Sequence, residues 1–238
     1  MPVVEWWQCR RAALLWCALA GAVAVALKYH FSAAAASDLQ WMLRPLAMLL
    51  QAVTGWSFLR DAAGNWESRA AGVVLIKACA GINFMVLSFL AWCWLWWPLR
   101  AWPPWQWPLR LGGALTCAWL LALCVNALRI LLILRFQPAL EHWFAPADAH
   151  RLLGLLTYLP ALCLQGFLAE RSEPVRAVLV ACSLYALLML GVPLASGGAA
   201  ADPRLYAAHA AEALAVLLPL LGFALWRHDC RTRRFSGS

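Results

Sequence analysis

Long apolar runs recur along the whole chain, and they constrain its fold more than any other feature. A run of about 18 or more apolar residues is long enough to cross a lipid bilayer as a helix. Six runs of roughly this length contain few charges, and the first is at the short end of the range. They predict an all-α fold, a polytopic membrane bundle of about six transmembrane helices. The runs cover residues 12–27, 70–97, 111–134, 150–169, 177–195 and 205–226.

Residues 39–59 have a more mixed pattern. Apolar side chains recur there at roughly helical spacing, but polar residues and a proline interrupt them. This pattern predicts a helix that lies at the membrane interface or inserts only partly, and a true span is the alternative. An alanine-rich linker is expected at 28–37, and a polar loop at 60–69.

The composition excludes an ordinary soluble domain. Of the 238 residues, 64% are hydrophobic and 13% are charged, whereas soluble domains are typically about half apolar and about a quarter charged. Because little length is left outside the apolar runs, we expect one integral membrane domain over residues 1–238. Any active site is then built from helices and their short connections. The net charge of +8 fits arginines on cytoplasmic loops rather than a nucleic-acid partner.

The cysteines give no sign of a metal site. None of the nine has a spacing such as C-x-x-C, and their irregular spacing also argues against a disulfide framework. We therefore expect neither a metal nor a cofactor.

The arginines predict the orientation of the chain, because cytoplasmic loops carry an excess of Lys and Arg. Arg10 and Arg11 precede the first apolar run and are typical of a retained signal anchor. With the amino terminus in the cytoplasm, the inner segments are richer in arginine than the outer ones, and six spans return the carboxyl terminus to the cytoplasm. The inner arginines are then Arg10, Arg11, Arg100, Arg110, Arg171, Arg176, Arg227, Arg231, Arg233 and Arg234.

This topology brings three reactive side chains to one depth on the outer side. Cys79 lies near the outer end of the second span, Arg129 near the outer end of the third, and His150 at the outer end of the fourth. The other cysteines fall on the cytoplasmic side or in mid-membrane, where a thiol behaves as a small hydrophobic group. Depth therefore distinguishes Cys79 from the rest.

These residue types suit thiol chemistry. A thiol is a weak nucleophile until it ionises, and nearby cations favour the thiolate. His150 is suited to accept the thiol proton and later to protonate a leaving amine. Arg129 carries a charge that is costly inside a span, so we expect it to face a polar cavity and to hold a thiolate or an oxyanion. Asn83, four residues after Cys79, and Asn126, three before Arg129, are candidates for orienting substrate or bonding the arginine.

Each residue alone also has an ordinary explanation. A cysteine in an apolar helix commonly packs in the core, a histidine at a helix start commonly lies at the interface, and an arginine near a span end can reach the headgroups. Two other functions therefore stay open. One is a non-enzymatic transporter or assembly factor in which Arg129 binds an anion. The other is a membrane enzyme for lipid-linked substrates, which would need carboxylates for a metal, and the spans offer almost none beyond Glu212.

The candidate residues belong to three short motifs, Ala78-Cys-Ala-Gly-Ile-Asn83, Asn126-Ala-Leu-Arg-Ile130 and His150-Arg-Leu-Leu-Gly154. In this order and spacing they resemble the exosortase/archaeosortase family of multi-span membrane proteins. The first motif continues into Phe84 and, with Arg44-Pro-Leu-Ala and Thr54-Gly55 upstream, looks most like the exosortase K branch. The resemblance covers residues from about 40 to about 165.

The resemblance implies an activity and a place in the cell. It implies a cysteine protease and transpeptidase that cleaves exported proteins before a carboxy-terminal membrane anchor, through a thioester acyl-enzyme. In bacterial members the sorting signal is of the PEP-CTERM kind. Cys79, Arg129 and His150 match the family's reactive cysteine, arginine and histidine, while Ala80 stands where the family often has serine. The implied partners are membrane-anchored substrate proteins and membrane lipids, and the implied location is the bacterial inner membrane with the site facing the periplasm.

Overall fold

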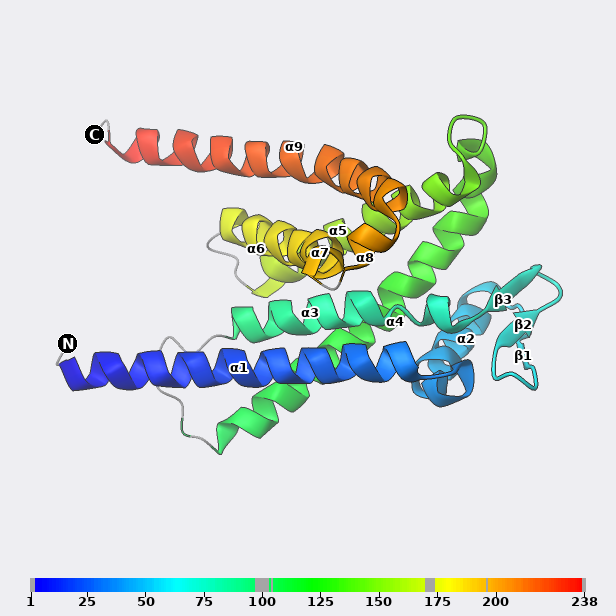
Figure 1. Cartoon of the computed structure of the whole chain (residues 1–238), viewed down its shortest axis with the longest axis horizontal. Helices are drawn as coiled ribbons and strands as arrows, with labels where there is room; N and C mark the ends of the chain where they lie inside the picture. Colours follow the sequence, from blue (N-terminus) through cyan, green and yellow to red (C-terminus); the bar gives the residue numbers. More distant parts are fainter. Residues whose placement is uncertain (1–2, 97–102, 104, 170–173, 196, 237–238) are drawn as a thin grey trace. The chain divides into compact units, whose positions relative to one another are not determined.

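The computed structural model describes residues 3–96, 103, 105–169, 174–195 and 197–236 (Figure 1). The fold is predominantly helical, as the sequence predicts, and it contains one small antiparallel sheet. The chain divides into two compact units, Met1–Leu131 and Leu132–Ser238, which are described in turn. The expectation of one membrane domain over the whole chain stays a prediction.

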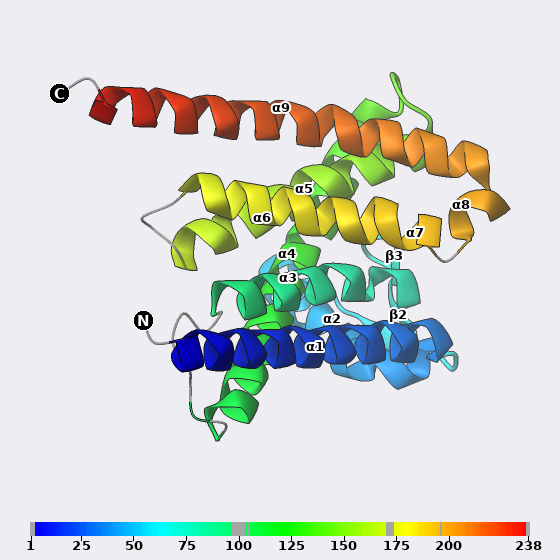
Figure 2. The same ribbon diagram turned by 60° about the vertical axis from the view of Figure 1, so that its left-hand side comes forward.

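The first unit is built on two helices that lie side by side, α1 and α3 (Figure 1, Figure 2). The first part of α4 crosses this pair obliquely, and α2 and the small sheet lie at the end where α1 finishes and α3 begins (Figure 1). The elements are α1 (Val3–Ala33), the 3₁₀ turn η1 (Ala36–Leu39), α2 (Gln40–Thr54), β1 (Leu59–Arg60), β2 (Trp66–Ser68), β3 (Val73–Leu75), the 3₁₀ turn η2 (Lys77–Ala80), α3 (Ile82–Leu95) and α4 (Gln106–Leu140).

Small residues let α1 approach α3 closely. Ala20 and Ala24 of α1 are buried, and small side chains are typical of helix contacts within membranes. Trp16 is fully buried, and its Nε1–H donates to the Cys93 carbonyl of α3 at 2.9 Å. A buried indole needs such a partner for its N–H, so this bond fixes the position of the two helices along each other.

Five helices in the described chain are long and apolar enough to cross a membrane. They match the first five predicted runs. The sixth run falls in α9 (Pro203–Ser236), whose described apolar part, Tyr206–Gly222, is shorter, so the count of six is not confirmed. The five are Arg11–Ala33, Lys77–Leu95, Gln106–Leu140, Asp148–Leu168 and Ala177–Ala195.

Two predicted boundaries are wrong. Helix α1 continues to Ala33, so residues 28–33 of the linker expected at 28–37 are helical, and the helix ends where the run of alanines begins. The loop expected at 60–69 and the beginning of the span expected at 70–97 form the sheet instead, and α3 starts only at Ile82. Strands of two or three residues are too short to show the alternation that identifies a strand in a sequence.

The sheet is an antiparallel meander in the order β1-β2-β3. Asp61 and Asn65 close the first hairpin, since the Asp61 carboxylate accepts from both the backbone and the side-chain N–H of Asn65, each at 2.8 Å. The side-chain bond is the main reason that the pKa of this exposed carboxyl lies below its ordinary value. Gln40 ties the hairpin to α2: its amide donates to the Gly64 carbonyl at 2.6 Å and accepts from Trp66 Nε1 at 2.9 Å.

Helix α2 has 15 residues and is about 22 Å long at ~1.5 Å per residue, short of the ~30 Å of a bilayer core. It ends at Gly55, which adopts the left-handed conformation (φ 73°) and donates its N–H to the Gln51 carbonyl at 2.9 Å. Its length favours the interfacial interpretation over a true span. One face is buried in the unit, through Met42, Leu43, Leu46, Ala47 and Leu50, and the opposite face exposes Trp41, Arg44, Met48 and Val53.

In the second unit, helices make up all of the regular secondary structure among the described residues. Arg151 of α5 links two of these helices, because it bonds Asp148 on its own helix and the carboxylate of Glu212 on α9, the latter at 3.2 Å. Helix α6 packs against both α5 and α9. The elements are α5 (Pro146–Ala169), α6 (Pro174–Ala186), the π-helical turn η3 (Leu187–Gly191), α7 (Val192–Ala195), α8 (Gly198–Ala201) and α9.

Helices α5 and α6 meet most closely at Gly166. A Cβ added there would lie 2.5 Å from Ala177 Cβ and 3.0 Å from Ala177 Cα. We expect Gly166→Ala to push the helices apart and to lower the free energy of unfolding by about 1–3 kcal/mol, measured as a lower thermal midpoint in detergent. Gly222→Ala in α9 is the control, because an added Cβ there meets nothing within 4 Å. Equal midpoints for the two variants would contradict this account of the contact.

Candidate active site

Cys79 has a backbone setting unlike that of the other cysteines. Of the cysteines that the structure describes, it is the one outside an α-helix, since it lies in the 3₁₀ turn η2 just before α3. Its N–H donates to the Ile76 carbonyl at 2.8 Å, and its side chain is half-buried. The sequence predicts Cys79 in the first third of a continuous span; it lies instead on a turn at the entrance of the helix.

Gly81 makes this turn possible. It has φ 69° and ψ 19°, a left-handed conformation that costs other residues free energy, and it both ends η2 and caps α3. Its carbonyl accepts the first bond of α3, from the Met85 N–H at 3.0 Å. A Cβ at this position would also lie 3.0 Å from Asn126 Cγ. The backbone conformation and the space beside it therefore both favour glycine.

Asn126 joins the turn to α4. Its side chain is fully buried, and its amide Nδ2 donates to the Cys79 carbonyl, a contact between residues 47 apart in sequence. An amide buried in an apolar helix is costly unless it is hydrogen-bonded, so the bond stabilises one position of α4 against the turn. Of the two roles expected for Asn126, substrate orientation and bonding to the arginine, neither includes this contact with the cysteine backbone.

Arg129 lies one helical turn after Asn126 and is half-buried. Residues three apart share a face of a helix, and the Asn126 contact shows that this face of α4 is directed at the Cys79 turn. The amino terminus of α3 follows the same turn, and such a terminus favours negative charge. Together these features make the vicinity of the turn suitable for a negatively charged group.

Two lysines also lie beside the turn. Lys28, on α1, donates from Nζ to Asn83 Oδ1 at 2.5 Å, so Asn83 bonds this lysine. Lys77 donates to the Ser32 and Ala34 carbonyls at 3.0 and 2.7 Å, at the end of α1. The sequence interpretation missed Lys28 because it put this residue in a linker. The absence of any Gly or Pro between Leu27 and Ala33 was the signal that would have found it, because nothing there breaks a helix.

His150 belongs to the second unit. It lies near the beginning of α5, with an exposed side chain, next to Arg151, which bonds Glu212. The structure therefore brings together Cys79 and Asn126, with Arg129 one turn further along α4. The convergence of His150 with these residues stays a prediction.

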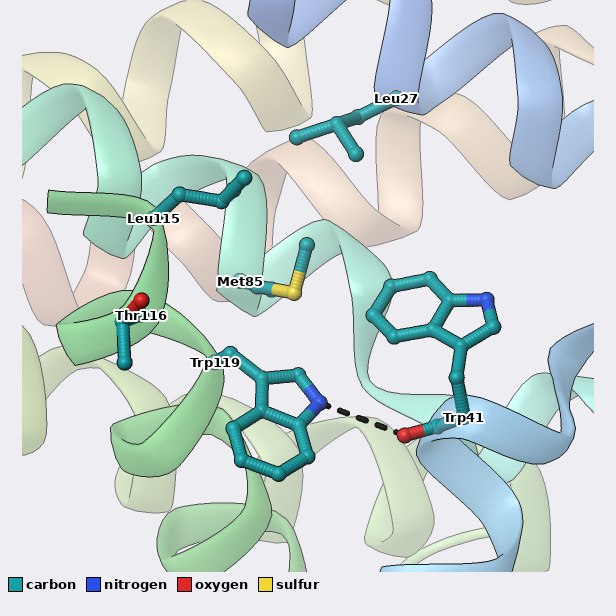
Figure 3. Close-up of a pocket in the computed structure, with 6 residues that line it drawn as sticks. All are labelled: Leu27, Trp41, Met85, Leu115, Thr116 and Trp119. Carbon is teal, nitrogen blue, oxygen red and sulfur yellow. Dashed lines mark hydrogen bonds between the residues drawn. The ribbon is translucent and has the colours of Figure 1, made fainter. Parts of the chain in front are cut away.

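An open-sided apolar cavity of about 440 Å³ lies within the first unit, among residues of α1, α2, α3 and α4 (Figure 3). Trp119, in its wall, donates from Nε1 to the Trp41 carbonyl at 3.3 Å. Trp119 precedes Asn126 by seven residues, which is about 10 Å along α4. The cavity is lined by Leu27, Trp41, Met85, Leu115, Thr116 and Trp119.

Comparisons of the chain with protein-family models, with curated proteins and with solved structures found no match.

Within the described ranges, no group of three or more His, Cys, Asp or Glu side chains is placed to hold a metal ion. The residues gathered around Cys79 are thus a thiol, amides and cations, and they suit nucleophilic chemistry on a substrate that develops negative charge.

Proposed function

We propose that this protein is a membrane cysteine protease and transpeptidase, similar to exosortases, that cleaves the carboxy-terminal sorting signal of exported proteins. The observation that carries this proposal is the contact between Asn126 and the Cys79 carbonyl. It joins two of the three sequence motifs on which the resemblance rests. It also holds the backbone that carries the thiol against the face of α4 that carries Arg129.

The proposed first step is acyl transfer to sulfur. The Cys79 thiol loses its proton to His150, and the sulfur attacks the carbonyl carbon of the scissile peptide. The oxyanion that forms is held by Arg129, whose guanidinium is always charged. When the C–N bond breaks, His150 returns the proton to the leaving amine. The amino-terminal part of the substrate is then a thioester on Cys79, and its carboxy-terminal anchor helix is released.

The proposed second step resolves the thioester. Water, or an amine on a lipid or glycan, attacks the thioester carbonyl and gives its proton to His150, and the sulfur leaves as the thiolate. Water gives hydrolysis, and an amine gives transpeptidation. Neither step uses a metal or a redox cofactor.

The proposed setting is the bacterial inner membrane, with both termini in the cytoplasm and Cys79 at the periplasmic face. The five long apolar helices support a membrane location. Because Cys79 is at the entrance of α3 and not within it, a peptide bond at the membrane surface is in reach. The substrate's anchor helix enters between the spans from the bilayer, and its sorting signal is of the PEP-CTERM kind.

The thioester is the intermediate that tests this function. A substrate with a carboxy-terminal anchor and an amino-terminal tag is incubated with a variant in which Cys79 is the one cysteine left. We expect a tagged adduct of enzyme and substrate that neutral hydroxylamine cleaves, and we expect that alkylation of Cys79 before incubation prevents it. Cleavage of the substrate by the alkylated protein would rule out the proposed chemistry.

A further inference from the structure

The two lysines of the chain lie around one aromatic ring. Lys28 and Lys77 are the only lysines in the sequence. The other 17 of its 19 Lys and Arg residues are arginines. Lys28 Nζ lies 5.8 Å from the centroid of the Phe31 ring, and Lys77 Nζ lies 5.1 Å from it. One lysine comes from α1 and the other from η2. Because both lie within 5.8 Å of one centroid, the two ammonium groups are at most about 11 Å apart.

Neither lysine has an acidic partner. Among the described residues, no carboxylate lies within ion-pair distance of either ammonium group. The hydrogen bonds of Lys28 and Lys77 go to one amide oxygen and two carbonyl oxygens, and since an ammonium group has three N–H donors, three N–H groups of the pair remain for a ligand. Two half-buried like charges repel each other, and an anion between them removes that repulsion.

The pair lies where the headgroups of a membrane would be. Lys28 is near the end of the candidate span Arg11–Ala33, and Lys77 is the first residue of the candidate span Lys77–Leu95. Leu27, which lines the apolar cavity, directly precedes Lys28 on α1, and Met85, which also lines it, lies on α3, the helix that follows Lys77 and η2 (Figure 3). Its volume of about 440 Å³ is in the range of small-ligand pockets, about 300–1,000 Å³.

We propose that Lys28 and Lys77 bind the phosphate of one anionic glycerophospholipid, and that one of its acyl chains extends into the apolar cavity lined by Leu27 and Met85. The charge of the pair complements the phosphate, and the apolar lining complements the chain. An acidic peptide would complement the charges, but it would not fill the apolar cavity. This cavity lies on helices long enough to cross a membrane, where an acyl chain is the apolar group at hand. The bound lipid holds the end of α1 against the Cys79 turn.

The presence of only two lysines gives a direct experiment. The full-length protein is placed in nanodiscs of phosphatidylcholine, with or without phosphatidylglycerol, and is treated with an amine-acylating reagent. A lysine in an added flexible tag is the reference. At about 90% occupancy of the site, phosphatidylglycerol should slow the acylation of Lys28 and Lys77 about tenfold relative to the tag. Inorganic phosphate or a soluble acidic peptide, added to phosphatidylcholine nanodiscs, should not.

Substitutions give a second measurement. Phosphatidylglycerol should raise the thermal midpoint of the wild-type protein, and the double variant Lys28→Gln/Lys77→Gln should lose that rise. The matched control Arg44→Gln/Arg60→Gln, at two exposed arginines of the same unit, should keep it. Equal acylation in both lipids, equal protection by phosphate or by the peptide, or loss of the rise in the arginine control would each overturn the proposal. Repeating the acylation with Cys79→Ala keeps the outcome independent of the thiol chemistry.

Discussion

Replacing Cys79 with alanine should lower the rate of substrate processing by at least about a thousandfold, because loss of a nucleophile removes the covalent route. The thermal midpoint should change little, since the side chain is half-buried and the turn is held by backbone and by Asn126. Processing is measured as the fraction of tagged substrate converted in membranes that contain equal amounts of each variant. Cys124→Ala is the matched control, since Cys124 is an exposed thiol on α4, and it should process substrate at the wild-type rate.

The same assay separates the enzyme from the non-enzymatic alternative. If Arg129 only binds an anion for transport or assembly, Arg129→Ala abolishes function and Cys79→Ala is tolerated. The proposed enzyme requires both residues. Unimpaired processing by Cys79→Ala would therefore disprove the role of Cys79 as the nucleophile and leave Arg129 as the residue to explain.

Gly81→Ala should lower processing by about ten- to a hundredfold, although alanine is the smallest possible change. The left-handed backbone costs alanine about 1–2 kcal/mol, and the new Cβ, 3.0 Å from Asn126 Cγ, forces the turn away from α4. A displacement of about 1 Å at a reacting group can cost about a hundredfold in rate. The measurement is processing per unit of folded protein, so that a loss of stability is not counted as a loss of activity.

Gly55→Ala is the control that separates the free-energy cost of the left-handed backbone from the effect of the contact with Asn126. Gly55 has nearly the same conformation, φ 73° against 69°, but an added Cβ there meets nothing within 4 Å. This variant should lose stability and keep its rate. An Asn126→Ala background removes the two closest contacts of the added Cβ, with Asn126 Cγ and Nδ2, and leaves the Asn126 Cβ at 3.3 Å, so the two effects should be less than additive. Full additivity would show that the contact between Gly81 and Asn126 has no part in positioning Cys79.

The sequence predicted the helices well and their connections poorly, for a physical reason. A membrane span needs many consecutive apolar residues, so its signal is summed over a long window. The strands near Trp66 are two or three residues long, and what holds them is the turn at Asp61 and the contacts of Gln40. Such contacts are non-local, and they leave no periodic pattern.

The candidate site was predicted in part. Counting residues from the ends of the spans gives the depth of a side chain but not the neighbour it faces. Asn83 was expected to meet Arg129 or substrate, and it bonds Lys28. Asn126 was expected to orient substrate or to bond the arginine, and it bonds the Cys79 carbonyl, a contact that depends on Gly81 adopting a positive φ. Hydropathy does not specify how a helix is rotated about its axis. It also does not specify the value of a single backbone dihedral angle.

The amide of Gln40 acts as a mechanical coupling. Helix α2 is too short to cross a membrane and exposes an apolar face, so its height follows the surface of the bilayer. Gln40 forms hydrogen bonds with both Gly64 and Trp66, so a displacement of α2 also displaces the hairpin. Strand β3 of this hairpin packs against the turn η2. The backbone that carries Cys79 is therefore tied, through this hairpin, to a helix that is too short to cross a bilayer.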